Sequence, residues 1–242
     1  PIIKKIQNHL REKVYGQDEA ISTVVSGYFN SVMTYNKNNT GNQRPKAVFL
    51  FAGAPGVGKT YLANAAAEAI GVPFHQFDMS SFSDKEAPLE FAGSDRVFKS
   101  SHEGLVTGFV RQNPRCVLLF DEIEKAHINI IHLFLQILDA GCLKDSFIGT
   151  NVSFKDAIII MTTNAGSEKS SSISGFAEKR EAQAKEKTEK ALFSFLRPEF
   201  INRIDEIITF NHLTKADFEK IAKLMLSQLS ESLSEKGIKL SY

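Results

Sequence analysis

Short runs of apolar residues recur along the chain, and segments with helical spacing of apolar positions lie between them. Runs of this kind, bounded by turn residues, are typical of strands buried on both faces. Strands that alternate with helices predict an α/β domain, with a doubly wound sheet between two helical layers. The expected strands are 47–51, 73–77, 117–120, 157–161 and 206–210, which together predict a parallel sheet of five strands.

The helical segments lie before or between these strands, as the α/β class requires. The alanine-rich segment 59–70 is predicted to be a helix that Gly71 terminates. Apolar residues at helical spacing predict another helix over 17–34. The segments 105–112 and 129–140 are also expected to be helical.

The chain changes character near residue 211. Thr214 and Asp217 have the spacing of a capping box, and the helix that follows is expected to end near Gly237. One face of that helix carries an apolar stripe formed by Phe218, Ile221, Met225 and Leu229. We therefore expect a large α/β domain over 1–210 and the beginning of a small helical domain, cut short, over 211–242.

Composition narrows the class of protein without naming a function. Lys and Arg total 29 against 28 for Asp and Glu, so the charge balance does not indicate binding to nucleic acid or to a membrane. No run reaches the roughly 18–20 apolar residues that span a bilayer. The two cysteines have no metal-ligand spacing and are too few for a disulfide scaffold. A cytoplasmic or organelle-matrix protein fits these observations best.

The segment 53–60, GAPGVGKT, fits the phosphate-loop pattern G-x-x-x-x-G-K-[ST] and stands between an expected strand and an expected helix. Glycines let backbone N–H groups surround phosphates, and the helix N-terminus adds partial positive charge. Lys59 is expected to reach the outer phosphates, and Thr60 to offer its hydroxyl to Mg²⁺. The predicted nucleotide-binding residues of the loop are Ala54, Pro55, Gly56, Val57, Gly58, Lys59 and Thr60.

Two carboxylates follow the apolar run that begins at Val117. Asp121 stands at the expected strand end and is predicted to bind Mg²⁺, while Glu122 is predicted to accept a proton from an attacking water. By itself such a pair is an ordinary strand exit, and the phosphate loop is what favours hydrolysis. No acceptor site typical of a kinase and no Asn-Lys-x-Asp guanine reader is found, so ATP is favoured over GTP.

Several further segments together resemble a AAA+ ATPase module of the Clp chaperone family, in particular the second module of ClpA-, ClpB- and ClpC-type proteins. The resemblance extends from about residue 11 to residue 236. It is carried by VYGQDEA (14–20), GAPGVGKT (53–60), FDMS (77–80), LLFDEIEKAH (118–127), IIIMTTNAG (158–166) and RPEFINRIDEIITF (197–210).

The resemblance implies roles for five residues outside the two motifs. Asn164 corresponds to the polar sensor that orients the hydrolytic water. Arg203 corresponds to an arginine finger that acts on the neighbouring subunit, which implies a homo-hexamer; the alternative is a structural ion pair with Asp205 or Glu206. The residues that correspond to adenine contacts are Val14, Tyr15 and Ile221.

In the family, a loop that faces the central pore carries an aromatic residue that grips the substrate polypeptide, and Phe98 is the candidate for that residue here. Where the family carries Gly-Tyr-Val-Gly, this sequence has Arg96-Val97-Phe98-Lys99, so an aromatic residue remains while both glycines are replaced. The family's Gly-Ala-Arg sensor is expected beyond residue 242. Ile173-Ser-Gly-Phe176 lies where ClpA- and ClpC-like motors carry a loop that docks on the Clp peptidase.

The favoured function is ATP-driven unfolding and threading of polypeptides. The alternative is a regulatory module whose nucleotide state controls assembly without threading. Nucleic-acid remodelling is disfavoured, because Arg96 and Lys99 supply only a small basic signal at the pore loop.

Overall fold

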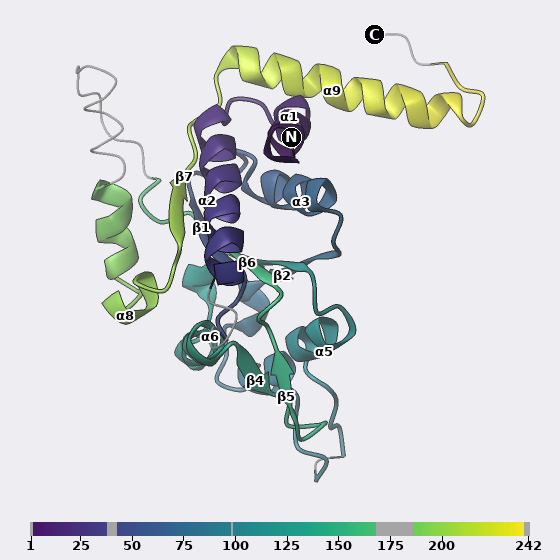
Figure 1. Cartoon of the computed structure of the whole chain (residues 1–242). Helices are drawn as coiled ribbons and strands as arrows, with labels where there is room; N and C mark the ends of the chain where they lie inside the picture. The colour runs from purple at the N-terminus through teal and green to yellow at the C-terminus, as the bar shows by residue number, and fades with distance from the viewer. Residues whose placement is uncertain (1, 38–42, 98, 168–185, 240–242) are drawn as a thin grey trace.

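A computed structural model describes residues 2–37, 43–97, 99–167 and 186–239. At its centre lies a parallel sheet of five strands in the order β2-β3-β6-β1-β7 (Figure 1). The strands are β1 (Ala47–Ala52), β2 (Phe74–Asp78), β3 (Val117–Asp121), β6 (Ile158–Thr163) and β7 (Glu206–Thr209). The predicted α/β class and all five predicted strands are confirmed, with ends that differ by only one or two residues.

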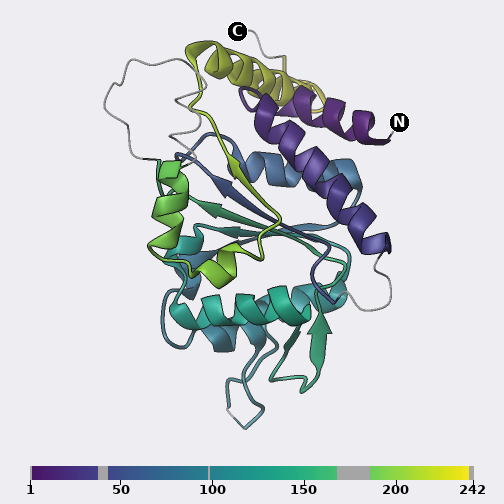
Figure 2. The ribbon, with the colours of Figure 1, turned by 60° about the vertical axis from the view of Figure 1, so that its left-hand side comes forward.

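Helices cover both faces of this sheet and form the expected three layers (Figure 2). One layer contains α1 (Ile2–Lys13), α2 (Asp18–Lys37) and α3 (Lys59–Ile70), and the other contains α4 (Ala87–Ala92), α5 (Leu105–Gln112) and α6 (Ile128–Ala140). The predicted helices 59–70 and 105–112 have the predicted ends. The predictions 17–34 and 129–140 are confirmed within a few residues.

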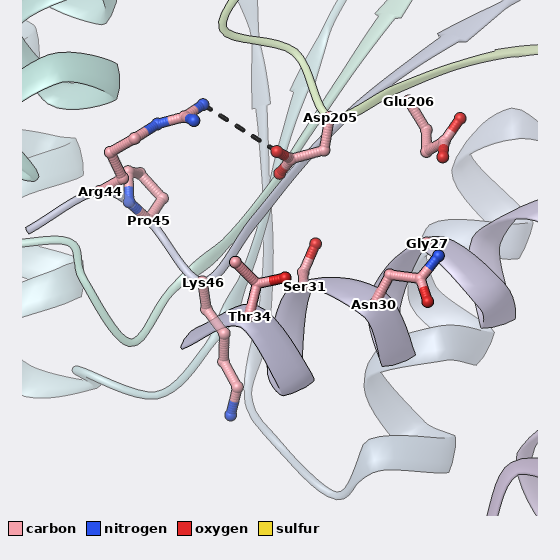
Figure 3. A pocket seen from close by; sticks show the side chains of 9 residues that line it. All are labelled: Gly27, Asn30, Ser31, Thr34, Arg44, Pro45, Lys46, Asp205 and Glu206. Atoms are coloured by element: carbon pink, nitrogen blue, oxygen red, sulfur yellow. Dashed lines mark ion pairs between the residues drawn. The ribbon is translucent and has the colours of Figure 1, made fainter. Parts of the chain in front are cut away.

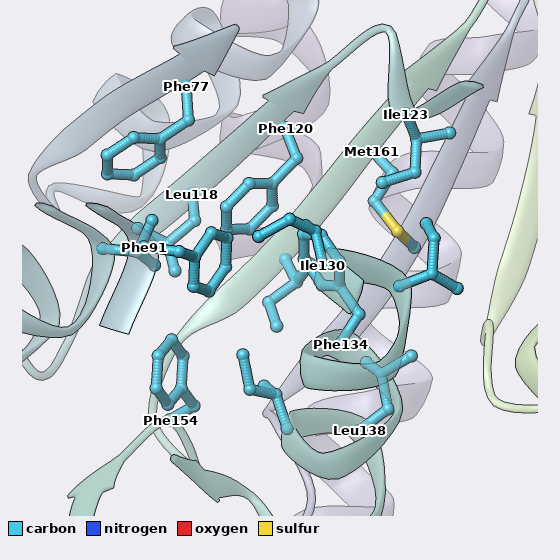
Figure 4. Packing of buried hydrophobic residues seen from close by; sticks show 14 of the residues in the cluster. Phe77, Phe91, Leu118, Phe120, Ile123, Ile130, Phe134, Leu138, Phe154 and Met161 are labelled. Atoms are coloured by element: carbon cyan, nitrogen blue, oxygen red, sulfur yellow. The ribbon is translucent and has the colours of Figure 1, made fainter. Parts of the chain in front are cut away.

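The alternation of side chains along β1 shows why two layers are needed. Phe49 and Phe51 pack with the layer of α1, α2 and α3, whereas Val48 and Leu50 pack with the opposite layer. All four are at most 1% exposed. In the second layer Phe120 of β3 meets Phe134 of α6 edge to face, with ring centroids 4.6 Å apart (Figure 4).

Elements that the sequence did not predict are mostly very short. They are α1, α4, the antiparallel pair β4 (Cys142–Lys144) and β5 (Asn151–Ser153), the 3₁₀ turns η1 (Met79–Phe82) and η2 (Ile123–Lys125), and α8 (Pro198–Ile201). Three or four residues hold too few positions for a hydrophobic period to emerge. Residues 186–193 are also helical, and Leu192 is fully buried.

The helix α9 (Lys215–Ser234) confirms the predicted capping box. The backbone N–H of Thr214 donates to Asp217 Oδ2 at 2.8 Å, and the backbone N–H of Asp217 donates to Thr214 Oγ1 at 3.3 Å. No residue of α9 is buried, and Phe218 and Met225 of its apolar stripe are 58% and 63% exposed. The division into domains 1–210 and 211–242 stays a prediction.

Two predicted functional features, Phe98 and the segment 173–176, lie outside the described residues. Within the part of the chain that the structure describes, no helix has both the length and the apolar character needed to cross a bilayer. Both cysteines are free, and burial raises the pKa of the Cys116 thiol to about 12, so it is an inert buried group.

Candidate functional site

The phosphate loop connects the end of β1 to the first residue of α3, as its motif predicts. Gly56 and Gly58 have φ angles of 76° and 102°, a backbone region that favours glycine. A Cβ atom at either position would meet no atom within 4 Å, so the space above the loop is open. A Cβ at Gly53 would lie 2.9 Å from Phe210 Cβ, and this close packing explains the first glycine.

Lys59 lies within the loop and is only 7% exposed. Its ammonium donates to the carbonyl oxygens of Gly53 at 2.5 Å and Ala54 at 2.9 Å, and to Asn164 Oδ1 at 2.9 Å. Burial lowers the pKa of Lys59, and the carboxylates of Asp121, Glu124 and Glu122 oppose that shift. The ammonium of Lys59 thus lies within the phosphate loop, and phosphate oxygens can replace the polar groups that it contacts there.

The predicted acidic pair ends β3. Asp121 Oδ1 accepts from Thr162 Oγ1 at 2.5 Å, and Oδ2 accepts from Gln76 Nε2 at 3.1 Å. Glu122 has a φ of 58° and is the only non-glycine residue with positive φ among those described. Such conformations cost energy and concentrate at functional sites, and the backbone N–H of Glu122 is held here by Thr162 Oγ1 at 2.9 Å.

Asn164, directly after β6, joins the lysine to the acidic pair. Its Nδ2 donates to Glu122 Oε1 at 2.9 Å, while its Oδ1 accepts from Lys59 Nζ. Its backbone N–H donates to Glu124 Oε1 at 3.0 Å. Three of the predicted site residues, Lys59, Asn164 and Glu122, therefore form one continuous hydrogen-bonded chain, and Lys125 pairs with the other Glu122 oxygen at 2.6 Å.

The residues at this edge of the sheet fit Mg·ATP. The first N–H groups of α3 have no partner within the helix, and no side chain caps them. Together with Lys59 they offer the donors and positive charge that phosphates require. Mg²⁺ is commonly held by one or two protein oxygens together with phosphate oxygens, and Thr60 and Asp121 supply oxygens of that kind.

Comparison with known proteins decides the family. The family model described as "AAA domain (Cdc48 subfamily)" matches residues 44–207, from just before β1 into β7. The chain belongs to this AAA domain family. The matched range contains the phosphate loop, the acidic pair, Asn164 and Arg203.

Curated relatives of this AAA domain confirm the resemblance to Clp-type ATPases. The ATP-dependent Clp protease ATP-binding subunit ClpE of Bacillus subtilis is 39% identical over 99% of this chain and 34% of its own length. Chaperone protein ClpB of Mycoplasma pneumoniae is 39% identical over 97% of this chain and 31% of its own. Chaperone protein ClpC3 of Oryza sativa is 38% identical over 96% and 26%. The chain thus spans about a quarter to a third of the length of these relatives.

In this AAA domain the predicted adenine contacts are only partly brought together. Val14 is 6% exposed and belongs to the same buried cluster as Val57 of the phosphate loop, and Tyr15 is half-buried. Ile221 lies on α9, and this helix approaches that segment at Gly16, where a Cβ would lie 2.9 Å from the Asp217 carboxyl. The roles of Val14, Tyr15 and Ile221 remain predictions.

Arg203 of the AAA domain follows α8 and forms an ion pair with Asp139 of α6, and its guanidinium also donates to the Glu199 carbonyl oxygen. Arg203 thus does form a structural ion pair, but its partner is Asp139, and the predicted partners Asp205 and Glu206 are wrong. The carboxyl of Asp205 instead accepts from the Val48 backbone N–H at 2.8 Å.

Arg44 braces the segment that carries Arg203. Its Nη2 donates to the Arg203 carbonyl oxygen at 2.6 Å, and its Nε donates to the Leu138 carbonyl oxygen at 3.3 Å. The same guanidinium lies 4.0 Å from Asp205 at a polar pocket of about 240 Å³ (Figure 3). Arg203 is therefore fixed beside the beginning of β1, whereas the phosphate loop follows the end of that strand.

Sequence reasoning missed three polar residues that support this site. Gln17 is fully buried; its Nε2 donates to the carbonyl oxygens of Val57 at 3.1 Å and Asn211 at 2.8 Å, and its Oε1 accepts from Asn211 N at 2.9 Å. The others are Glu124 and Thr162. All three stand inside the motifs that carry the family resemblance, but nothing in residue spacing separates them from their neighbours.

Proposed function

We propose that this chain is the ATP-hydrolysing motor module of a Clp-type unfoldase or disaggregase that threads polypeptides. The hydrogen-bonded chain from Lys59 through Asn164 to Glu122 carries the proposal. It connects the group suited to bind the outer phosphates with the group suited to activate water. The names of the relatives, an ATP-binding subunit of a protease and two chaperone proteins, support the polypeptide substrate.

The proposed roles follow from the contacts of each side chain. Lys59 exchanges its carbonyl partners at Gly53 and Ala54 for phosphate oxygens, and Thr60 with Asp121 holds Mg²⁺. Mg²⁺, when bound, neutralises the charge that develops on the transferred phosphoryl group. Glu122 accepts the proton of the attacking water, and the amide of Asn164 keeps its carboxylate oriented.

Arg203 is proposed to act on the nucleotide of a neighbouring subunit in a homo-hexamer. Its backbone lies beside Arg44, before β1, and Lys59 touches Gly53, after β1. The strand between spans about 20 Å, beyond the reach of one arginine side chain. This separation supports action of Arg203 on the site of another subunit, and a closed ring would supply one such arginine to every site.

Docking on a Clp peptidase through residues 173–176 belongs to the same proposal, as does a location in the cytoplasm or an organelle matrix. Two relatives have chaperone names and one has a protease-subunit name, so their names leave open whether a peptidase is part of the assembly. An experiment separates the assembly with a peptidase from the one without it. Addition of a Clp peptidase should produce ATP-dependent proteolysis, which Ile173→Glu with Phe176→Glu should abolish while ATP turnover persists. A chain that never stimulates the peptidase would refute the docking.

The decisive test of hydrolysis is Glu122→Gln in the protein at its full natural length. Glutamine has the same size and keeps an oxygen for Asn164 Nδ2, but it cannot accept the proton. We expect ATP turnover to fall by about 10²- to 10⁴-fold, with ATP affinity kept within a few-fold. Phosphate release measures the first and titration with a fluorescent ATP analogue the second.

Glu12→Gln makes the same chemical change at an exposed site on α1 and should alter neither quantity. Normal turnover of Glu122→Gln would remove Glu122 from its role. The regulatory alternative is tested by Phe98→Ala: a threading motor should lose polypeptide unfolding and keep nucleotide binding, whereas a regulatory module should assemble as before.

A further inference from the structure

Two loops that are far apart in the sequence lie side by side at one end of the molecule (Figures 1 and 2). One is the segment 93–104, between α4 and α5, which we call the tip loop. The other is the turn 145–150 between β4 and β5, which we call the hairpin loop. Arg96 Nε donates to the Phe147 carbonyl oxygen at 2.8 Å, and the Arg96 guanidinium lies 4.9 Å from the centre of the Phe147 ring.

The carboxylate of Asp145 stands between these two loops and is fully buried. From the tip-loop side it accepts the backbone N–H of Gly104 at 3.0 Å and the hydroxyl of Thr107 at 2.5 Å. From its own loop it accepts the backbone N–H groups of Phe147 at 2.9 Å and Ile148 at 3.0 Å. Four donors from two segments thus converge on one side chain.

The charge state of Asp145 agrees with this role. Burial by itself raises the pKa of a carboxyl, but the hydrogen bonds from Thr107, Ile148, Gly104 and Phe147 outweigh burial and hold the pKa of Asp145 below its ordinary value. The group is therefore an ionised acceptor at neutral pH. Charge-assisted hydrogen bonds of this kind are stronger than neutral ones.

The other end of the tip loop closes on the same carboxylate. Gly93 has a φ of 82°, and a Cβ there would lie 2.7 Å from Asp145 Oδ1, so only glycine fits. The Ser146 backbone N–H donates to the Ala92 carbonyl oxygen at 2.9 Å. Across the base of the loop, Ser94 N donates to the His102 carbonyl oxygen at 3.1 Å. Both ends of the tip loop are therefore anchored to the hairpin, while Val97 beyond them is 85% exposed.

We propose that Asp145 is a positioning residue that joins the tip loop and the hairpin loop into one rigid unit, through which the hairpin loop carries the force that the tip loop exerts on a threaded polypeptide. The inference rests on the proposed threading function and assigns the hairpin loop, which no sequence motif marked, the role of supporting the tip loop. A loop that pulls on a polypeptide must pass force to the body of the subunit. The hydrogen bonds of Asp145, together with Arg96 over Phe147, provide that connection.

The test is Asp145→Asn in the protein at its full natural length, with two readouts. Asparagine keeps one acceptor oxygen but replaces the other with a donor that faces backbone N–H groups. We expect hydrogen exchange of peptides covering 93–104 to accelerate at least tenfold, while peptides covering β3 exchange as before. We also expect the number of fluorescent proteins with an unstructured tail that are unfolded per ATP hydrolysed to fall about tenfold.

A merely structural role of Asp145 would change ATP hydrolysis and unfolding in proportion and leave their ratio intact. Phe147→Ala, which removes only the ring beneath Arg96, should lower the ratio to a smaller extent, and Glu12→Gln should leave it unchanged. Unaltered exchange in the tip loop of Asp145→Asn would overturn the inference whatever the unfolding assay gives. A wild-type protein that hydrolyses ATP but unfolds no polypeptide would instead refute the threading function, and the exchange result would still decide whether Asp145 anchors the loop.

Discussion

The position of Arg203 leads to a prediction that separates action within a subunit from action between subunits. Arg203→Ala leaves Lys59, Asn164 and Glu122 in place but removes the guanidinium at the far end of β1. An arginine finger contributes about 10³- to 10⁵-fold to turnover. At about 1.36 kcal/mol for each factor of ten, this corresponds to about 4–7 kcal/mol of transition-state stabilisation. Loss of the ion pair with Asp139 accounts for little of that, because exposed pairs contribute about 1 kcal/mol or less.

The assay mixes Arg203→Ala subunits with Glu122→Gln subunits, each of which is expected to be inactive alone. In a mixed ring, an Arg203→Ala subunit keeps its own Glu122 and receives Arg203 from a Glu122→Gln neighbour. Random assembly of equal amounts places this pair at about one interface in four, so about a quarter of the wild-type rate should return. Phosphate release is measured after the subunits have been exchanged.

Two controls complete this experiment. Asp139→Asn breaks the same ion pair but keeps the guanidinium, so its turnover should stay within a few-fold of wild type. Sedimentation should show that each variant assembles as the wild type does. If the assembled mixture stays as inactive as its components, Arg203 does not act between subunits, and the geometric argument for a ring is wrong.

Three further predictions follow from contacts that the motifs did not reveal. Gln17→Ala leaves the Val57 and Asn211 backbone groups without their side-chain partner. The free energy of unfolding, measured by urea denaturation, should therefore fall by about 1–3 kcal/mol, and ATP affinity should weaken. An unchanged denaturation midpoint would show that these hydrogen bonds do not stabilise the fold. Glu124→Ala should slow ATP turnover with little change in affinity, while Glu124→Gln, which keeps an acceptor for the Asn164 N–H, should recover most of the rate; equal rates of the two variants would show that this hydrogen bond is unimportant. Burial raises the pKa of Asp205, although the Val48 N–H and Arg44 oppose the shift. The stability gained by keeping Asp205 protonated in the folded protein is therefore fully present below about pH 4 and is lost as the pH rises through the raised pKa. Relative to wild type, Asp205→Asn should gain stability over that window, and a constant difference would refute the shift.

The phosphate-loop motif predicted Lys59, the acidic pair predicted Glu122, and the family resemblance added Asn164; the fold explains why the three lie together. In a parallel sheet the carboxyl ends of neighbouring strands meet at one edge. Because β1, β6 and β3 are neighbours, the residues that follow them must come together, and Lys59, Asn164 and Glu122 do so. The partner of Arg203 was not predictable in the same way. Asp139 lies 64 residues earlier, on a helix whose rotation depends on how Phe134 and its neighbours pack.

The carboxylates of this chain differ in whether their hydrogen-bond donors are side chains or backbone N–H groups, and residue spacing alone does not predict this difference. The oxygens of Asp121 accept from the side chains of Thr162 and Gln76, which can rotate away and release the carboxylate to a metal ion. Asp145 accepts three backbone N–H groups, whose positions are fixed by the fold, so its lone pairs cannot be given to a ligand without breaking both loops.

Glu124 lies between these extremes. One of its oxygens accepts the backbone N–H of Asn164, and the other is buried and has no hydrogen-bond partner among the described residues. Such an oxygen is costly unless something compensates it, and the nearby ammonium of Lys59, whose pKa Glu124 helps to raise, supplies part of that compensation. Glu124 is thus hydrogen-bonded to the backbone of Asn164 and also contributes negative charge near Lys59. We therefore expect a movement of Lys59 on nucleotide binding to change the charge around Glu124 and, through the hydrogen bond of Glu124, the position of the Asn164 backbone.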